Sequence, residues 1–164
     1  MILVGMEAIN GKTQAKTRFK KVVVIGIRDL WCGVEMKYVN EVSSLLKITN
    51  VPWTPEYLLG VSNLRGNIIS LVDTGMLLGR DPCVVKSTTR IVVCKSDGIQ
   101  TGLLVDSMFE IADVDEAAID TALTSQGTVR AEYISGEFEY NKRIVTVLNM
   151  PGIAEKLRTE RCSI

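Results

Sequence analysis

The chain has 164 residues, of which 46% are apolar, enough to bury the core of one ordinary domain or of two very small ones that share a core. It contains no histidine, which removes the commonest general base and zinc ligand and disfavours an enzyme. The net charge is zero and only 5% of the residues are aromatic, whereas nucleic-acid-binding proteins usually carry a basic patch with exposed aromatic side chains.

The N-terminal part of the chain is predicted to be an arm followed by strands. Residues 1–17 show little periodicity and are predicted to form a flexible arm. Phe19–Ile27 and Leu30–Val34 are predicted to form a hairpin that turns at Arg28-Asp29. Val39–Val42 continues into a third predicted strand.

Two short segments connect this strand to the middle of the chain. Residues 43–50 fit either a strand or a loop. Thr54–Gly60 is predicted to form one or two helical turns, because Thr54 suits an N-cap, Pro55 a first helical residue and Gly60 a stop signal.

The rest of the chain is organised around Gly60–Gly79, which contains a turn at Asn63–Gly66 and a strand at Ile68–Val72. The strand is apolar and β-branched, as expected of a strand that is covered on both faces. Gly66 permits the positive φ that a sharp chain reversal needs. Arg65 is therefore a charged side chain on a tight turn between ordered elements, and we expect the function to be located there.

A second set of elements follows a polar connector. Its first two predicted strands flank a turn at residues 96–98. The set comprises the strands Arg90–Cys94, Thr101–Val105, Ser107–Ala112 and Arg143–Leu148, a helical turn at Glu116–Ile119, and a C-terminal amphipathic helix at Ile153–Arg161, with Met150–Gly152 ending the last strand.

The two sets of elements indicate an internal duplication. An offset of 76 residues places Tyr57 on Tyr133 and Gly60 on Gly136, and it also aligns the strand at Ile68–Val72 with the strand at Arg143–Leu148. Near the front, an offset of 69 places Gly33 on Gly102 and Glu41 on Glu110. The same order of elements therefore occurs twice, in repeat halves at about residues 18–80 and 87–153.

Each half is small and has about five short strands. A sheet of that size best avoids exposed edges by curling into a barrel. We therefore predict a mostly β fold of two five-stranded β-barrels side by side, with strands that can be exchanged between them, and with short helices including one at the C-terminus. The cleft between the barrels would be the natural site for a partner.

Charge is unevenly distributed along the chain. Residues 1–51 carry eight Lys or Arg against four Asp or Glu, whereas residues 96–129 carry seven acidic residues and no basic one. This pattern fits an ordinary solvated face, and it also fits docking of a basic edge against an acidic edge. The acidic residues lack the order of a calcium-binding loop, so no metal is expected.

The four cysteines are scattered and form no Cys-x-x-Cys pair, which favours free or buried thiols in a reducing compartment. No apolar run approaches the roughly 18–20 residues of a membrane span. The apolar start, Met1–Met6, lacks the basic lead of a signal peptide. We therefore expect a cytoplasmic protein without direct membrane insertion and without a cofactor.

Several segments resemble the CheW-like chemotaxis coupling proteins. The resemblance covers about residues 18–158, with residues 159–164 left as a C-terminal tail. It is carried by Cys32–Val42, Gly60–Gly66, Ile69–Asp73, Gly102–Asp106 and Tyr133–Gly136.

The resemblance implies a fold of two SH3-like five-stranded barrels, which agrees with the duplication. It implies an adaptor that links transmembrane chemoreceptors to a CheA-type histidine kinase, whose regulatory domain shares the fold. A groove between the barrels would bind the cytoplasmic hairpin tip of the receptor, and the kinase would make edge-on contacts. The family positions that affect coupling match Val39, Glu41, Gly60 and Arg65.

The sequence departs from the family pattern in two places. Trp31-Cys32 stands where an acidic-aromatic pair is usual, which changes the strand at the edge of a barrel. Thr74-Gly75 follows Asp73 in place of a typical Leu-Arg, which removes a basic residue, so no contact is assigned there.

The predicted protein-interaction site combines these positions with the rest of the Asn-Leu-Arg-Gly turn. Each residue also has a structural interpretation, as core, solvated charge or backbone requirement. Arg65 suits an interface because its planar guanidinium forms several hydrogen bonds, and we predict that it pairs with Glu41. The predicted set is Val39, Glu41, Gly60, Asn63, Leu64, Arg65 and Gly66.

The sequence thus predicts a non-catalytic adaptor that couples chemoreceptors to a CheA-type kinase in bacterial chemotaxis. The alternative is a small β-barrel module that binds nucleic acid, which would require a continuous basic stripe with exposed aromatic side chains. An enzyme would require a pocket with convergent polar groups, for which the sequence offers no clear candidate.

Overall fold

The structure is a computed structural model that describes residues 16–122 and 130–162. Most of the predicted arm, residues 1–15, lies outside the described residues, as do residues 163–164 of the predicted tail. The first five strands are β1 (Phe19–Ile27), β2 (Leu30–Glu35), β3 (Val39–Ser43), β4 (Leu58–Leu64) and β5 (Asn67–Asp73). The next five are β6 (Arg90–Ser96), β7 (Ile99–Val105), β8 (Ser107–Asp115), β9 (Ile134–Tyr140) and β10 (Arg143–Leu148).

Short helices connect these strands, and one longer helix ends the described chain. The 3-10 turns are η1 (Met36–Tyr38), η2 (Glu116–Ala118) and η3 (Ala131–Tyr133). The α-helices are α2 (Thr74–Leu77) and α3 (Met150–Cys162). The predicted C-terminal helix is confirmed and begins three residues earlier than expected.

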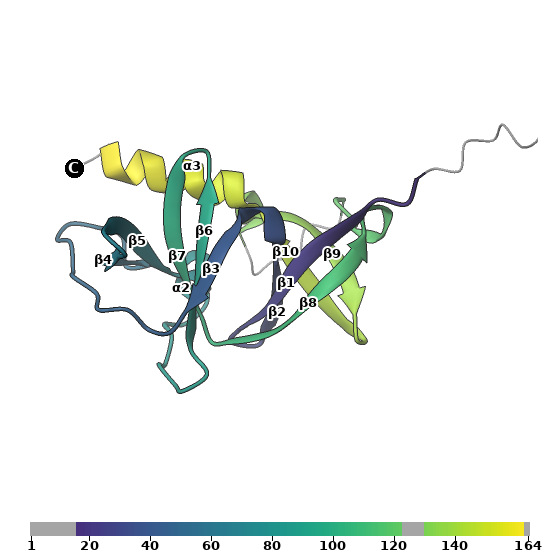
Figure 1. The fold of residues 1–164 in the computed structure, drawn as a ribbon, viewed down its shortest axis with the longest axis horizontal. Coiled ribbons are helices and arrows are strands. Elements are labelled where there is room, and N and C mark those ends of the chain that lie inside the picture. Colours follow the sequence, from purple (N-terminus) through teal and green to yellow (C-terminus); the bar gives the residue numbers. More distant parts are fainter. Residues whose placement is uncertain (1–15, 123–129, 163–164) are drawn as a thin grey trace, which may run out of the picture.

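The strands form two five-stranded sheets, each curled into a small barrel. The β1 barrel has the order β8-β1-β2-β10-β9, and the β6 barrel has the order β3-β6-β7-β5-β4. If five is added to the numbers of β1–β5 and subtracted from the numbers of β6–β10, one strand order becomes the other. Equivalent strands of the two halves therefore occupy equivalent places in the two barrels. The two barrels lie side by side in Figure 1, with the β6 barrel on the left.

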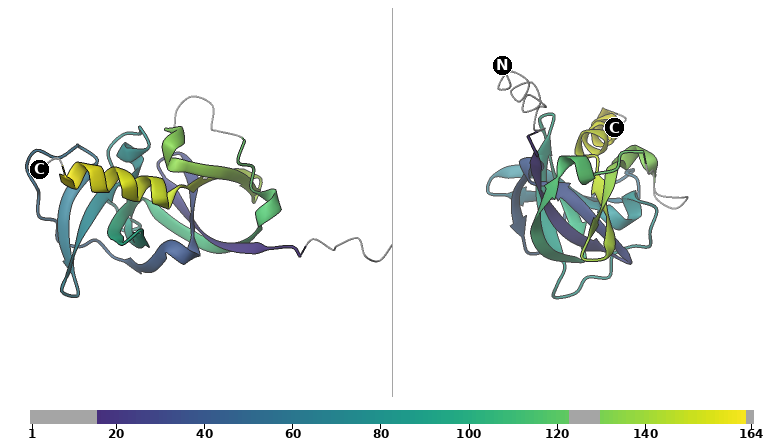
Figure 2. Two further views of the ribbon diagram at one scale, coloured as in Figure 1. Left: turned by 90° about the horizontal axis from the view of Figure 1, so that it is seen from above. Right: turned by 90° about the vertical axis from the view of Figure 1, so that its right-hand side faces the viewer.

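Each barrel contains strands from both halves of the chain. The chain crosses from the β1 barrel to the β6 barrel between β2 and β3, and it returns between β7 and β8. Helix α3 follows β10 of the β1 barrel but packs on β6 and β7 of the other barrel (Figures 1 and 2). The exchange of strands makes the two barrels one interdependent unit.

The largest apolar core lies between the barrels. Strand β1 illustrates how this core forms, because its side chains alternate between two buried faces. Val22 and Val24 point into the β1 barrel, whereas Val23 and Ile25 pack in the core between the barrels. We call this cluster the inter-barrel core; its members include Val23, Ile25, Ile27, Cys32, Val34, Val72, Val92, Cys94, Leu103, Val105, Met150, Ile153 and Leu157. Its members come from both barrels and from α3, so packed side chains occupy the space between the barrels where the sequence predicted a cleft.

Equivalent contacts in the two halves support the duplication. The backbone N–H of Asp73 donates to the carbonyl of Tyr57 at 2.8 Å, and that of Asn149 donates to the carbonyl of Tyr133 at 2.7 Å. The side chains of Asp73 and Asn149 then accept from backbone N–H groups in α2 and α3, each at 3.2 Å. The offset of 76 residues found in the sequence therefore relates contacts as well as residue types.

The predicted helix at Thr54–Gly60 is wrong. β4 begins at Leu58 and pairs with β5, so the backbone of Leu58–Gly60 is extended. Thr54 does not cap a helix; its hydroxyl donates to the carbonyl of Val51 at 2.9 Å. Gly60 has φ 141° and lies against the backbone of Thr49, where an added Cβ would collide.

Three further expectations need correction. Ile68 is 64% exposed, because it lies at the start of β5, before the pairing of β5 with β7 begins at Ser70. Strands β4 and β9 escape prediction because Gly60 and Gly136 interrupt their apolar patterns. Met150–Gly152 does not terminate a strand but forms the first turn of α3, where Pro151 needs no hydrogen-bond partner for its nitrogen.

Part of the unevenly distributed charge is neutralised by ion pairs within the chain. Lys21 forms an ion pair with Asp113 at 2.9 Å, and Lys20 lies 3.4 Å from both Glu35 and Glu116. The pairs with Asp113 and Glu116 join β1 to β8 and its extension, whereas Glu35 lies on β2, the other neighbour of β1 in the sheet. Part of the basic N-terminal region is therefore neutralised by the acidic segment of the same molecule.

Candidate protein-interaction site

The β4–β5 hairpin carries five of the seven predicted site residues, Gly60, Asn63, Leu64, Arg65 and Gly66. Its two-residue turn, Arg65-Gly66, has φ values of 52° and 86°, which match the right-handed twist of the flanking strands. The side-chain oxygen of Asn63 accepts from the backbone N–H of Gly66 at 2.8 Å. An added Cβ at Gly66 meets nothing within 4 Å, so this glycine is required by backbone conformation and not by space.

Leu64 and Gly60 lie inside the barrel wall. Leu64 is 8% exposed and packs with Ile69 and Leu71 in the interior of the β6 barrel. Gly60 is buried beside Thr49, whose backbone forms an isolated bridge with Val61. Both residues therefore fix the hairpin, and the exposed part of the predicted set is Asn63, Arg65 and Gly66.

Arg65 and Glu41 contact each other as predicted. The guanidinium Nη1 of Arg65 lies 3.5 Å from the carboxylate Oε2 of Glu41. Glu41 belongs to β3, and the turn that carries Arg65 follows β4, so the ion pair spans the two edge strands of the β6 barrel. Because the Arg65 side chain is 78% exposed, the pair contributes at most about 1 kcal/mol to folding.

The β1 barrel contains an equivalent contact in which a neutral asparagine replaces the arginine. Asn141 occupies the place of Arg65 at the offset of 76, and Glu110 occupies the place of Glu41 at the offset of 69. The Asn141 amide donates to the Glu110 carboxylate at 3.5 Å. A side-chain contact from the hairpin turn to the opposite edge strand is therefore common to both barrels, and the positive charge is specific to Arg65.

Exposed apolar side chains extend the inter-barrel core to the surface on two edge strands. Val42 is 38% exposed and lies opposite Val92, which belongs to the inter-barrel core. Ile111 is 45% exposed and lies opposite Val23, also of that core.

Two further side chains on the same two strands contact this core. Half-buried Val39 packs on it, and Met108 lies opposite Ile25, which is one of its members. We call Val39, Val42, Met108 and Ile111 the groove margin, after the groove between the barrels that the family resemblance implies.

A cluster of charged groups lies at the end of β7, where the chain crosses between the barrels. Arg28, on the β1–β2 turn, donates to Asp73 at 2.8 Å and to the carbonyl of Asp81 at 2.8 Å. Its backbone N–H and its guanidinium both donate to Asp106. Asp73 also accepts from the backbone N–H of Cys83 at 2.7 Å. We call Arg28, Asp73, Cys83 and Asp106 the junction cluster.

The thiol of Cys83 donates to Asp106 at 3.2 Å. Burial, reinforced by this hydrogen bond to a carboxylate, raises the pKa of Cys83 to about 11. The thiol is therefore protonated at neutral pH and serves as a donor, not as a nucleophile. This cluster is not evident from the sequence, because its members are far apart in the chain.

Trp31, one of the departures from the family pattern, forms an aromatic stack. Its ring lies 4.5 Å from that of Phe109 on β8, and the Arg143 guanidinium lies 4.9 Å from its centroid. The stack passes over Gly26, where an added Cβ would lie 3.1 Å from the Phe109 ring. Trp31 therefore ties β2 to β8 across β1.

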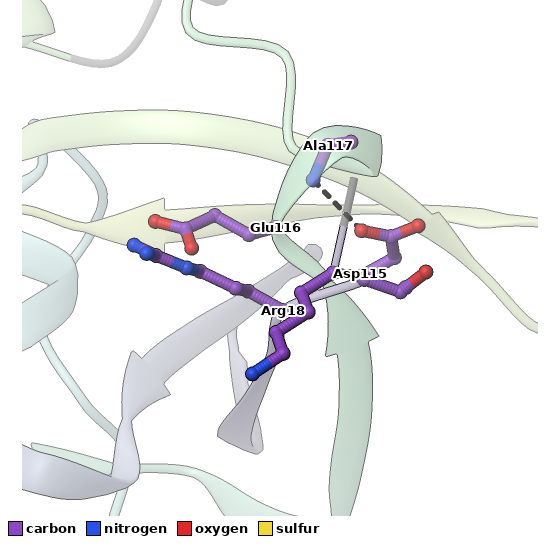
Figure 3. Close-up of a pocket in the computed structure, with 6 residues that line it drawn as sticks. Arg18, Asp115, Glu116 and Ala117 are labelled. Atoms are coloured by element: carbon purple, nitrogen blue, oxygen red, sulfur yellow. Dashed lines mark hydrogen bonds between the residues drawn. The ribbon is translucent and has the colours of Figure 1, made fainter. Parts of the chain in front are cut away.

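Cavities in the described residues do not resemble an active site. A pocket of about 480 Å³ at the start of β1 is lined by two cationic and two anionic side chains, and Arg18 and Glu116 extend in the same direction along it (Figure 3). A second pocket, of about 370 Å³, adjoins Arg28 and Asp106 of the junction cluster. Within the ranges that the structure describes, no group of three or more acidic or cysteine side chains is arranged to hold a metal ion.

The comparison with known families decides the assignment. The model of the CheW-like domain matches residues 21–158. The chain belongs to the CheW-like family. Its predicted fold class is confirmed, because this family has two SH3-like subdomains.

Individual relatives agree with the family. The chemotaxis protein CheW of Helicobacter pylori is 30% identical over 119 residues, which cover 72% of this chain and 71% of that protein. A probable chemotaxis protein CheW of Rhizobium etli is 24% identical over 141 residues, covering 86% and 91%. The crystal structure of the scaffolding protein TtCheW from Thermoanaerobacter tengcongensis superposes with a TM-score of 0.75 at 27% identity, covering 81% of this chain and 90% of that one.

The CheW-like assignment confirms the predicted function class. The chain is a non-catalytic scaffold that couples chemoreceptors to CheA in chemotaxis. The nucleic-acid-binding alternative gains no support from these comparisons. Among the described residues, no helix is long and apolar enough to cross a membrane.

Proposed function

We propose that the groove margin binds the cytoplasmic hairpin tip of a chemoreceptor. The observation that carries this proposal is that Val42 and Ile111, on edge strands of different barrels, both extend the inter-barrel core to the surface. An amphipathic helix presents apolar side chains at three- and four-residue intervals and can bury them in such a groove. The receptor helix would cover the exposed side chains of the groove margin and so extend the inter-barrel core.

The β4–β5 hairpin is the proposed second contact surface, for the regulatory domain of a CheA-type kinase. Arg65 projects from its turn with 78% of the side chain exposed, and Glu41 engages only one edge of the guanidinium. The other N–H groups can donate to acidic or carbonyl groups of a partner at an edge-on contact. Asn63 and Gly66 hold the turn in the required conformation.

Separate surfaces allow the chain to bind both partners at once. Simultaneous binding raises the local concentration of kinase at the receptor, so modest individual affinities suffice. The proposed place of action is the cytoplasm, where the protein is recruited to receptor arrays at the membrane.

Calorimetric titration with each partner separately tests this assignment. Val42→Glu and Ile111→Glu are each expected to weaken binding of the receptor hairpin at least about tenfold, because a buried unpaired carboxylate would face the apolar helix. Binding of the kinase regulatory domain should stay within about twofold. Ile144→Glu is the matched control, since Ile144 is a 57% exposed isoleucine on β10, which is neither of the two strands that carry the groove margin.

The proposed function is contradicted if the groove-margin variants fold normally and bind the receptor hairpin as the unmodified protein does. It is also contradicted if Ile144→Glu weakens receptor binding as strongly as they do.

A further inference from the structure

The side chain of Arg28 connects three segments that belong to different parts of the fold. Arg28 sits on the β1–β2 turn of the β1 barrel, whereas Asp73 ends β5 of the β6 barrel. Asp106 occupies the crossover between β7 and β8. One guanidinium therefore donates to a carboxylate of the other barrel, to the crossover and to the carbonyl of Asp81.

Arg28 has an unusual backbone conformation and an unusually buried side chain for an arginine on a turn. Its backbone φ is 56°, in the left-handed region that favours glycine, yet the residue is an arginine with a side chain only 16% exposed. Asp73 is 2% exposed and is occupied on both oxygens, by Arg28 and Met76 on one and by Cys83 on the other. A buried carboxylate in this position requires a cationic partner.

Gly75 makes room for the guanidinium. A Cβ added at this glycine would lie 2.7 Å from Nη2 and 2.8 Å from Cζ of Arg28. Gly75 is also the position at which the sequence lacks the arginine expected after Asp73. The Arg28 guanidinium thus occupies the space that a side chain at position 75 would enter first.

The equivalent place in the second half is built differently. Asp97 corresponds to Arg28 and has a similar φ of 50°, and Asn149 corresponds to Asp73. There, the Arg158 side chain from α3 donates to the carbonyl of Asp97 at 2.8 Å. The β6–β7 turn is therefore held by the long C-terminal helix, while the β1–β2 turn is held by its own arginine.

We propose that Arg28 is the positioning residue of the groove margin, and that the absence of a side chain at Gly75 provides the slot for its guanidinium. Asp106 lies two residues before Met108, so the contacts of Arg28 fix where β8 leaves the junction and how far it stands from β3 of the other barrel. The binding effect rests on the proposed receptor function, whereas the effect on barrel spacing does not.

Paired substitutions separate this role from general stability. Arg28→Gly removes the guanidinium and supplies a residue suited to the left-handed turn. The swap Arg28→Gly with Gly75→Arg returns a basic group to the same slot from the other side. Spin labels carried by non-canonical amino acids at exposed Lys95 in β6 and Glu139 in β9 report the distance between the barrels, and the native cysteines remain.

We expect Arg28→Gly to broaden the distance distribution and to weaken receptor-hairpin binding about tenfold, with binding of the kinase regulatory domain unchanged within about twofold. The swap variant is expected to restore both the narrow distribution and receptor affinity. If Arg28→Gly does not fold, Arg28→Lys replaces it, because lysine keeps one charge but cannot form the same set of bonds.

The proposal is overturned if the distance distribution of the folded single variant matches that of the unmodified protein. It is also overturned if the distance distribution of the swap variant is as broad as that of the single variant. It is also overturned if the distribution broadens while receptor affinity is unchanged. If the unmodified protein does not bind the receptor hairpin, the proposed function fails, and the distance measurement still decides whether Arg28 positions the barrels.

Discussion

The two barrels share a backbone plan but differ in the charge of equivalent side chains. The turn residue of the β4–β5 hairpin is Arg65, and that of the β9–β10 hairpin is Asn141. Both contact a glutamate on the opposite edge strand at 3.5 Å, Glu41 in one barrel and Glu110 in the other. Closure of the barrel explains the contact in both places, but it does not require the positive charge of Arg65.

The same divergence occurs at the ends of β5 and β10. Asp73 and Asn149 cap the following helices at equal distances. Only Asp73 is charged, and only Asp73 recruits an arginine from the other barrel. The two halves therefore share the geometry of the helix cap and differ in its charge.

The largest expected effect comes from making the first half resemble the second. Asp73→Asn keeps the helix cap but removes the charge that faces Arg28, and breaking a buried ion pair typically costs about 3 kcal/mol. Urea unfolding should therefore show a lower midpoint with an unchanged slope. The reciprocal control, Asn149→Asp, is expected to change stability by less than about 1 kcal/mol, because this half-exposed side chain keeps its capping bond. Equal losses in the two variants would break the comparison.

A second test compares the two faces of the inter-barrel core. Burial raises the pKa of Cys32, from the β1 barrel, and of Cys94, from the β6 barrel, to about 12 each. Above the ordinary thiol pKa the unfolded chain loses protons that the folded protein keeps, so stability falls as pH rises. For the two thiols together the loss between pH 9 and pH 10 is about 2 kcal/mol.

Chemical denaturation at several pH values measures this loss. Cys32→Ala and Cys94→Ala should each remove about half of the decline that the thiols cause. A decline that responds to only one of the two substitutions would show that the faces are not equally buried.

A smaller effect is expected from exchanging the turn residues that differ in charge. Arg65→Asn reproduces the neutral contact of the other barrel and should change the free energy of unfolding by less than about 0.5 kcal/mol. It is expected to weaken binding of the kinase regulatory domain about tenfold, which corresponds to 1.4 kcal/mol. Asn141→Ala is the matched control in calorimetry, and a similar loss of kinase binding in that variant would contradict the assignment of Arg65.

The smallest effect concerns the second residue of each turn. Gly66 and Lys142 are equivalent and both have positive φ, 86° and 62°. Gly66→Ala should cost about 1 kcal/mol, since a side chain is disfavoured in that conformation. Lys142→Gly should gain less than about 1 kcal/mol, because the relief of strain is offset by a more flexible unfolded chain. Thermal unfolding of both variants measures the difference, and changes of the same sign would contradict it.

Much of the fold follows from local patterns in the sequence. Phe19–Ile27 and Arg143–Leu148 are apolar enough to be assigned as strands, and the repeated Gly and Tyr positions reveal the duplication. Those patterns allow an exchange of strands between the barrels, which the structure shows, but they do not determine it. Both an exchanged and an unexchanged pair of barrels bury the same apolar faces, and the choice depends on where the two crossovers run.

The candidate site was predictable only where a single residue and its local position in the chain were enough to indicate a contact. The Arg65–Glu41 contact follows from a charged residue on a tight turn next to an edge strand, and the structure confirms it. The junction cluster does not, since Arg28 and Asp106 are separated by 78 residues. The available signal was an arginine, in place of glycine or asparagine, in a two-residue hairpin turn between strongly apolar strands.

Amide chemical-shift changes on titration with a receptor cytoplasmic hairpin test the central claim most directly. If the margins of the inter-barrel core form one binding surface, the amides of Val39, Val42, Met108 and Ile111 should shift together at the same hairpin concentration. Shifts confined to one barrel, or centred on the β9–β10 hairpin, would contradict the account.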